Sequence, residues 1–235
     1  MSFFQFKHFK IIQEVAAVKV GTDAMLLGAF VEVSNVQRIL EIGTGTGVIS
    51  LMLAQKNPFV SIDALEIHPD TAKEASLNVS NSKYAHTIKV LTQDILTFTS
   101  LDKYDLIVTN PPYFEHGLLP ENPKDNLAKH IDKARLHKWF EKIADLLSES
   151  GKCWMILPLD SLDEWIELAN SYQLFLSLKL ILFAKPSVSK RVIVCFTNIY
   201  SDVRLQDFCI RNSDGSYTSE YIALTKEFHD RVPVR

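Results

Sequence analysis

The chain has 235 residues, of which 47% are hydrophobic and 23% charged, and 25 Lys and Arg against 28 Asp and Glu give a net charge of −3. This composition is that of a folded globular protein, which excludes disordered and collagen-like chains. At roughly 150 residues per domain, the length predicts one domain with small additions. The charge does not indicate a nucleic-acid partner, so any such partner has to be inferred from local basic clusters.

Three cysteines, Cys153, Cys195 and Cys209, form no Cys-x-x-Cys pair and are odd in number. We interpret them as free thiols in a reducing compartment rather than as a disulfide framework or a zinc site. No hydrophobic run reaches the roughly 18 residues of a membrane helix, and the first ten residues mix apolar with polar side chains. The sequence therefore predicts a cytoplasmic protein that neither spans a membrane nor binds a metal.

From about residue 36 to 200, short β-branched runs alternate with longer amphipathic segments, which is typical of a mostly parallel α/β sheet with helices on both faces. Helices are expected at about 46–56, 69–81, 133–148 and 161–171. Seven strands are expected, at Arg38–Ile42, Val60–Glu66, Ile88–Gln93, Asp105–Asn110, Lys152–Leu157, Phe175–Ala184 and Arg191–Asn198. The last two are joined by a segment too short for a parallel crossover, so they should form a hairpin with one antiparallel strand at the end of the sheet.

Two extensions flank this core, residues 1–35 and 201–235, and we expect all parts to form one domain. Alternating aromatic residues between Phe3 and Val20 predict a small strand pair. The segment Lys19–Phe30 predicts a helix with Thr22 or Asp23 as N-cap, and Thr218–His229 predicts a closing helix capped by Thr218 or Ser219. A proline-rich loop runs from Pro111 to about Ala128, and loops of this length are usually functional or mobile.

Three of the eight glycines fall in the segment Gly43-Thr44-Gly45-Thr46-Gly47, directly after the first predicted strand of the core. In an open α/β sheet this turn is where nucleotide-like cofactors bind, because backbone N–H groups at the helix start face them. Val48 stands where the dinucleotide fingerprint requires glycine, which disfavours a nicotinamide oxidoreductase. The run Glu41–Gly47 resembles motif I of class I S-adenosylmethionine-dependent methyltransferases, and a tight turn without a ligand is the alternative.

Acidic residues close the next two predicted strands. Glu66 ends the second strand, and one carboxylate can accept hydrogen bonds from both hydroxyls of a ribose. A solvated charge at a strand end is the alternative for Glu66. Asp94 follows the third strand, where the methyltransferase superfamily binds the adenine amine, and Ile95 is expected to pack on the adenine ring.

The strand Asp105–Asn110 runs directly into Pro111, Pro112 and Tyr113. An exocyclic aryl amine is a poor nucleophile because its lone pair is delocalised, and Asn110 Oδ1 with the Pro111 carbonyl can accept its two N–H bonds. Pro111 restricts the turn through its fixed φ, and Tyr113 can stack on a flipped-out base. The motif resembles that of amino-methyltransferases acting on adenine N6, cytosine N4 or glutamine N5.

The chain resembles the bacterial tRNA(Val) N6-adenine methyltransferase family over nearly its whole length, through Phe4–Lys7, Leu51–Lys56, Asn110–Phe114, Lys190–Cys195 and Ile210–Thr225. That family methylates the adenine immediately 3′ of the anticodon, and the segment from Lys19 matches an element that packs against the methionine end of the cofactor. The resemblance implies catalysis by Asn110, Pro111, Pro112 and Tyr113. It implies S-adenosyl-L-methionine bound by Lys19, Thr22, Glu41, Gly43, Gly45, Gly47, Glu66, Ile67, Asp94, Ile95 and Asn110.

Basic clusters are the candidates for contacts to RNA phosphates, which position a nucleic acid without reading its bases. The segment Lys129–Lys138 has four Lys or Arg and two His against one Asp, and Lys185, Lys190 and Arg191 flank the predicted hairpin turn. Ordinary solvated faces are the alternative explanation. The candidate RNA contacts are Tyr113, Lys129, His130, Lys133, Arg135, Lys190 and Arg191.

Other functions stay open. The acceptor can be another RNA, such as rRNA, or a protein glutamine, because the Asn-Pro-Pro-Tyr motif is shared among such enzymes. A non-catalytic RNA-binding or chaperone module is a further alternative, although it gives no reason to keep four chemically matched residues.

Overall fold

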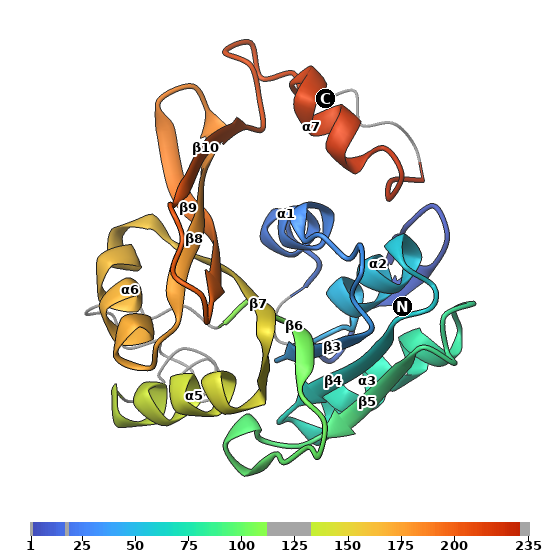
Figure 1. Ribbon diagram of the computed structural model, residues 1–235. Coiled ribbons are helices and arrows are strands. Elements are labelled where there is room, and N and C mark those ends of the chain that lie inside the picture. The colour runs from blue at the N-terminus through green and yellow to red at the C-terminus, as the bar shows by residue number, and fades with distance from the viewer. Residues whose placement is uncertain (1, 17–18, 112–132, 231–235) are drawn as a thin grey trace, which may run out of the picture.

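The computed structural model describes residues 2–16, 19–111 and 133–230 (Figure 1). Its main sheet is built from β3 (Arg38–Ile42), β4 (Ser61–Glu66), β5 (Ile88–Thr92), β6 (Tyr104–Thr109), β7 (Leu147–Pro158), β8 (Phe175–Lys185), β9 (Val188–Thr197) and β10 (Arg204–Cys209). The strand order is β10-β8-β9-β7-β6-β3-β4-β5. Strands β7, β6, β3, β4 and β5 pair in parallel, whereas β9 is antiparallel to both β7 and β8.

Helices cover both faces of this sheet. The described helices are α1 (Thr22–Phe30), α2 (Val48–Lys56), α3 (Pro69–Ser80), α5 (Lys133–Leu146), α6 (Leu162–Ser171) and α7 (Ser219–Thr225), with short 3-10 turns at Ile95–Thr97 and Leu159–Ser161. Side chains of α1, α2 and α3 share one core with the sheet, and those of α5 and α6 share the other. Within the described residues, none of these helices is long and apolar enough to cross a membrane.

The central strands are apolar on both sides because each side faces a different core. In β6, Leu106 and Val108 belong to the core under α1 and α2, whereas Ile107 belongs to the core under α5 and α6. Strands buried on both faces lose the alternation of apolar and polar residues and appear as continuous hydrophobic runs. For this reason the core strands could be placed from the sequence within a few residues.

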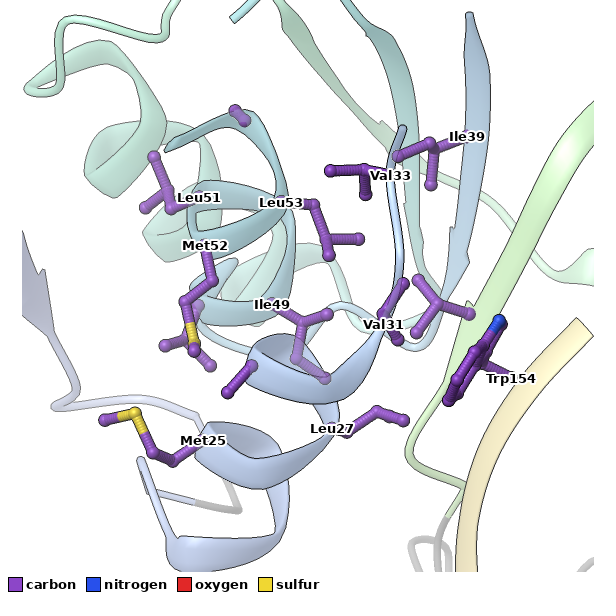
Figure 2. Close-up of a cluster of buried hydrophobic side chains, with 14 of the residues drawn as sticks. Met25, Leu27, Val31, Val33, Ile39, Ile49, Leu51, Met52, Leu53 and Trp154 are labelled. Carbon is purple, nitrogen blue, oxygen red and sulfur yellow. The ribbon is translucent and has the colours of Figure 1, made fainter. Parts of the chain in front are cut away.

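Helices α1 and α2 approach closely on the first face. Figure 2 shows Met25 and Leu27 of α1 near Ile49 and Met52 of α2, with Trp154 of β7 beside them. A Cβ added at Gly28 of α1 would lie 2.8 Å from the Met52 sulfur. A glycine in the last turn of this helix therefore serves the close approach, at some cost in helix propensity.

The expected Rossmann-like α/β class is confirmed, but two details of the sheet differ from the prediction. The sequence predicts seven strands with the antiparallel one at the end, whereas β9 lies inside the sheet and β10 adds an eighth strand parallel to β8. Strand β10 reads Arg-Leu-Gln-Asp-Phe-Cys, and its first four residues are exposed. A polar edge strand carries no hydrophobic run, so the sequence pattern does not reveal it.

The predicted N-cap residue is correct for α7 and wrong for α1. Thr218 caps α7 by accepting a hydrogen bond on Oγ1 from the backbone N–H of Tyr221, at 3.1 Å. Helix α1, in contrast, begins after Gly21, and no side chain caps it. Asp23 does not cap its own helix because its carboxylate accepts a hydrogen bond from Nε of Arg191 on β9 at 3.0 Å.

The cysteines are free thiols, as the sequence predicts. Cys153 and Cys195 are buried in β7 and β9, and burial raises the pKa of both, that of Cys195 to about 11. A thiol in such surroundings stays protonated and unreactive.

The predicted N-terminal strand pair is present as β1 (Phe3–Gln5) and β2 (Lys10–Ile12), which are antiparallel. Helix α3 holds this extension through the side chain of Asn78. Its Oδ1 accepts from the N–H of Ile12 at 2.8 Å, and its Nδ2 donates to the carbonyls of Ile12 and Thr46, each at 2.9 Å. The side-chain amide of Asn78 therefore joins the N-terminal extension to the segment Gly43–Gly47, which we call the glycine loop.

A second buried side chain of α3 fixes the segment that follows. Both carboxylate oxygens of Glu74 accept hydrogen bonds from consecutive backbone N–H groups, Glu14 and Val15 at 2.7 and 2.9 Å and Ala16 at 3.0 Å. Hydrogen bonds to an ionised acceptor are the stronger kind. The extension is thus attached beside the turn between β3 and α2.

Replacing Asn78 with Ala should lower the free energy of unfolding by about 2–4 kcal/mol, because the buried carbonyl of Thr46 and the partly buried N–H and carbonyl of Ile12 lose their partner. Urea unfolding measures the change. Ser80→Ala, at an exposed position on the same helix, is the matched control and should change stability by less than about 0.5 kcal/mol. Equal stabilities of the two variants would show that the extension is held by other contacts.

Candidate active site

The parallel register brings four strand ends together at one edge of the sheet. Ile42, the last residue of β3, lies opposite Thr109 of β6 and Leu65 of β4. Glu66 of β4 lies opposite Thr92 of β5. Asn110, Gly43, Glu66 and Asp94 therefore leave the sheet side by side. Ligands of open α/β sheets bind outside the carboxyl ends of the strands, and this is such a place.

The glycine loop has a backbone that requires glycine. Gly43, Gly45 and Gly47 have φ of +72°, +56° and +82°, in the left-handed region that residues with a Cβ rarely adopt. A Cβ added at Gly43 or Gly45 would meet nothing within 4 Å, whereas one at Gly47 would meet Ala75 of α3 at 3.7 Å. Gly43 and Gly45 thus border open space where a ligand can approach the backbone, and Gly47 packs on α3.

The predicted ribose-binding carboxylate, Glu66, faces this loop. Its Oε2 accepts from the N–H of Gly45 and its Oε1 from the N–H of His68, each at 3.0 Å. Glu66 is buried with 6% of its surface exposed, so a solvated strand-end charge does not describe it. Each carboxylate oxygen has a further acceptor direction, and these remain able to receive ligand hydroxyls.

Glu41 lies deeper, at 1% exposure, and is held by the loop and by α2. Its Oε2 accepts hydrogen bonds from Thr44 Oγ1 at 2.7 Å, from the N–H of Ser50 at 3.0 Å and from Ser50 Oγ. Its Oε1 has no hydrogen-bond partner among the described residues. Burial raises the pKa of Glu41 from 4.5 to about 7, against the opposing effect of these hydrogen bonds. A buried acceptor atom without a partner indicates a place for a ligand donor.

Asp94 joins two predicted sites. Its Oδ1 accepts from the N–H of Leu96 at 3.0 Å, and its Oδ2 pairs with Nη2 of Arg135 on α5 at 2.6 Å. Arg135 is a predicted RNA contact, so the structure places a candidate cofactor residue and a candidate RNA residue in one ion pair. Beside them, Ile95 is buried, and Ile67 after β4 is 47% exposed.

Asn110 and Pro111 follow β6 at the same edge. Thr109, just before them, donates its Oγ1 hydrogen to the carbonyl of Ile42 at 3.0 Å, which fixes the end of β6 against β3. Asn110 is half-buried and Pro111 is buried. Pro112, Tyr113, Lys129 and His130 lie outside the described residues, as does the side chain of Lys133.

The other predicted residues lie around the start of α1. Lys19 and Thr22 are exposed, and Thr22 lines a cavity of about 260 Å³ together with Lys190 and Arg191. The structure therefore places Thr22 beside two candidate RNA contacts, and its predicted role at the cofactor stays a prediction. Among the residues that the structure describes, no group of three His, Cys, Asp or Glu could hold a metal ion.

Sequence reasoning missed three buried polar residues of the site, Ser50, Glu74 and Asn78. Each lies at 7% exposure or less. Ser50 interrupts the apolar run Val48–Ala54 in α2, and a polar residue within such a run usually has a buried partner. That interruption was the available signal for Ser50. The partners of Glu74 and Asn78 are backbone groups distant in sequence, for which no local pattern exists.

Comparison with known proteins places the chain in a family. A family model described as methyltransferase small domain matches residues 16–159. Curated proteins named tRNA1(Val) (adenine(37)-N6)-methyltransferase from Bacteroides fragilis and Phocaeicola vulgatus are 38% and 40% identical over 231 and 228 residues, with 97% of each chain covered. The chain belongs to this methyltransferase family. The member from Pseudoalteromonas translucida is 37% identical and covers 97% of this chain and 99% of its own.

Solved structures of low identity share the fold of this family member. A predicted O-methyltransferase of Agrobacterium tumefaciens has a TM-score of 0.68 at 19% identity and covers 88% of this chain and 96% of its own. An O-methyltransferase of Brevibacillus brevis, in complex with S-adenosyl-L-homocysteine, has a TM-score of 0.52 at 21% identity, with 68% and 54% covered. These neighbours confirm the methyltransferase fold.

The raised pKa of Glu41 predicts a pH effect on stability. The pKa of Glu41 is 4.5 in the unfolded chain and about 7 in the folded protein. At a pH between these two values the folded protein keeps a proton on Glu41, and unfolding releases it. The free energy of unfolding should therefore fall as pH rises through this window, by at most about 3 kcal/mol relative to Glu41→Gln. Urea unfolding of both proteins across the window measures the difference in slope. Parallel curves would show that Glu41 titrates normally.

Proposed function

We propose that the protein is an S-adenosyl-L-methionine-dependent methyltransferase that modifies N6 of an adenine in tRNA. The proposed target is the adenine 3′ of the anticodon in a valine tRNA. The observation that carries the proposal is the alignment of Asn110, the glycine loop, Glu66 and Asp94 at adjacent strand ends, in a chain that belongs to a family of this name.

The residues at the strand ends fit the cofactor. Gly43 and Gly45 leave open space along the backbone, Glu66 has acceptor directions for ribose hydroxyls, and Asp94 follows β5 where an adenine amine can be accepted. The unpartnered Oε1 of Glu41 is suited to an ammonium group. When bound, S-adenosylmethionine supplies an electrophilic methyl group on its sulfonium.

Asn110 and Pro111 have the chemistry to orient the amine that is methylated. Asn110 Oδ1 and the Pro111 carbonyl accept one N–H bond each, which favours a pyramidal nitrogen with its lone pair directed at the methyl group. The hydrogen bond of Thr109 to Ile42 and the fixed φ of Pro111 restrict the backbone that carries these two acceptors. No strong base is required, because the methylated ammonium loses its proton readily.

The RNA side of the proposal depends on Tyr113 and on the basic residues. Tyr113 would stack on the flipped-out adenine, a contact of roughly 1–3 kcal/mol. Lys129, His130 and Lys133 follow the catalytic motif in the sequence, and Arg135 is held next to Asp94. These residues are proposed to contact phosphates, which position the RNA.

Replacing Asn110 with Ala should lower the rate of methyl transfer at least about a hundredfold, because one of the two acceptors for the amine is lost. The affinity for S-adenosyl-L-homocysteine, measured by calorimetry, should fall far less than turnover, because Asn110 is one of eleven predicted cofactor contacts, and retained binding also shows that the variant folds. Equal losses of binding and turnover would contradict this division of roles.

The acceptor is tested by transfer of labelled methyl groups to bulk tRNA from cells that lack this gene, beside rRNA and release factor, followed by nucleoside mass spectrometry. We expect N6-methyladenosine in a valine tRNA. Label on rRNA or on a protein glutamine would keep the Asn-Pro-Pro-Tyr chemistry and contradict the tRNA assignment. Cofactor binding without label on any acceptor would favour a non-catalytic RNA-binding module.

A further inference from the structure

A basic cavity lies beside the proposed active site and includes residues that no motif assigns. It has a volume of about 260 Å³ and is formed by the start of α1, the β8–β9 hairpin and the segment between β10 and α7. Its described lining has three cations, Lys190, Arg191 and Arg211, and one acid, Asp23. The whole chain has a net charge of −3, so this excess of positive charge is local. We call this cavity the C-terminal groove.

One wall of the C-terminal groove is a stack of aromatic and guanidinium groups. The rings of Tyr217 and Tyr221 are 4.6 Å apart and inclined by only 12°. The guanidinium carbon of Arg211 lies 3.9 Å from the centre of the Tyr217 ring. Tyr221 is buried at 5% exposure and anchors the stack, whereas Arg211 and Tyr217 are half-buried. Arginine planes and tyrosine rings are the surfaces on which unstacked RNA bases pack.

The turn that carries this stack is ordered by its own hydrogen bonds. Arg211 and Tyr217 form an antiparallel bridge, and Arg211 Nη1 donates to the carbonyl of Gly215 at 2.6 Å. The N–H of Asn212 donates to the carbonyl of Ser216 at 2.8 Å, and that of Gly215 donates back to the Asn212 carbonyl at 3.0 Å. An exposed turn fixed in this way loses little conformational entropy when a partner binds.

The hairpin residues of the C-terminal groove lie toward the same end of the parallel strands as Asn110. In the register of the sheet, Thr109 of β6 is opposite Met155 of β7, and Pro158 at the end of β7 is opposite Arg191 of β9. Arg191 therefore lies level with the last residue of β7, the strand next to β6, and three residues beyond the level of Thr109. Its Nε is 3.0 Å from Asp23 Oδ2, which orients the guanidinium at the start of α1.

We propose that the C-terminal groove binds the RNA substrate next to the target adenine. Lys190, Arg191 and Arg211 contact the sugar-phosphate backbone, and an unpaired base stacks on the outer face of the Arg211 guanidinium, which Tyr217 and Tyr221 support from the other side. The inference rests on the proposed function and adds a determinant of RNA binding formed by the C-terminal segment. An acidic protein partner would also use the cations, but it would not require the stack of a guanidinium on two parallel tyrosines.

The test compares Lys190→Gln/Arg211→Gln with the wild-type enzyme on unmodified valine tRNA. The double variant should raise KM for tRNA at least about tenfold, with a smaller effect on kcat. It should also lower the slope of log affinity against log salt by about 1–2, because phosphate contacts are lost. The affinity for S-adenosyl-L-homocysteine should stay the same, which shows that the fold is intact.

Lys89→Gln is the control for loss of an exposed cation away from the groove, because Lys89 is exposed on β5, the outermost strand on the other side of the sheet from β10. Arg211→Lys should keep the salt slope of the wild-type enzyme, because the charge is kept. It should still raise KM for tRNA, because the planar stack is lost. Tyr217→Leu should raise KM without changing the salt slope.

The outcomes separate the two proposals. If the wild-type enzyme does not methylate tRNA, the proposed function is wrong. If the wild-type enzyme is active and the double variant has the KM and salt slope of Lys89→Gln, the C-terminal groove does not bind RNA and the inference is overturned. Unchanged tRNA binding together with lost binding of an acidic polypeptide such as polyglutamate would assign the groove to a protein partner and would also overturn it.

Discussion

The parallel pairing of β6, β3, β4 and β5 is the constraint on which the site depends. Because these strands run in one direction and in register, the residues that follow them emerge at one edge, although Gly43 and Asn110 are far apart in the chain. Burial of both faces of the strands fixes that register. A shift of one strand by one residue would turn its apolar side chains to the wrong core. The chemistry of the site is therefore held in place by the packing of the two cores.

Around this edge, buried polar groups hold the N-terminal extension and the glycine loop in place. Asn78 and Glu74 attach the N-terminal extension to α3 beside the glycine loop, and Glu66 binds the loop itself through Gly45. Glu41 binds the glycine loop through the hydroxyl of Thr44, and its Oε1 has no hydrogen-bond partner among the described residues. The described part of the proposed site is held by these contacts without a ligand, so the proposed cofactor would require little rearrangement of it on binding.

The sequence was sufficient for the sheet core and for the residues that follow its central strands, because continuous apolar runs and a glycine cluster are strong local signals. It was insufficient where long-range contacts decide. Strand β10 is polar because it lies at an edge, and Asp23 pairs with Arg191 instead of capping α1. The ion pair of Asp94 with Arg135 joins residues 41 positions apart, and no spacing rule predicts it. The C-terminal groove likewise exists only once three distant segments are packed together.

The most direct test is a crystal structure of the protein with S-adenosyl-L-homocysteine. We expect the ligand to lie along Gly43 and Gly45, with its ribose hydroxyls within hydrogen-bonding distance of the Glu66 carboxylate and its ammonium group toward Glu41. A ligand bound elsewhere, with Glu66 contacting only the backbone N–H groups of Gly45 and His68, would contradict the assignment of the strand ends as the cofactor site.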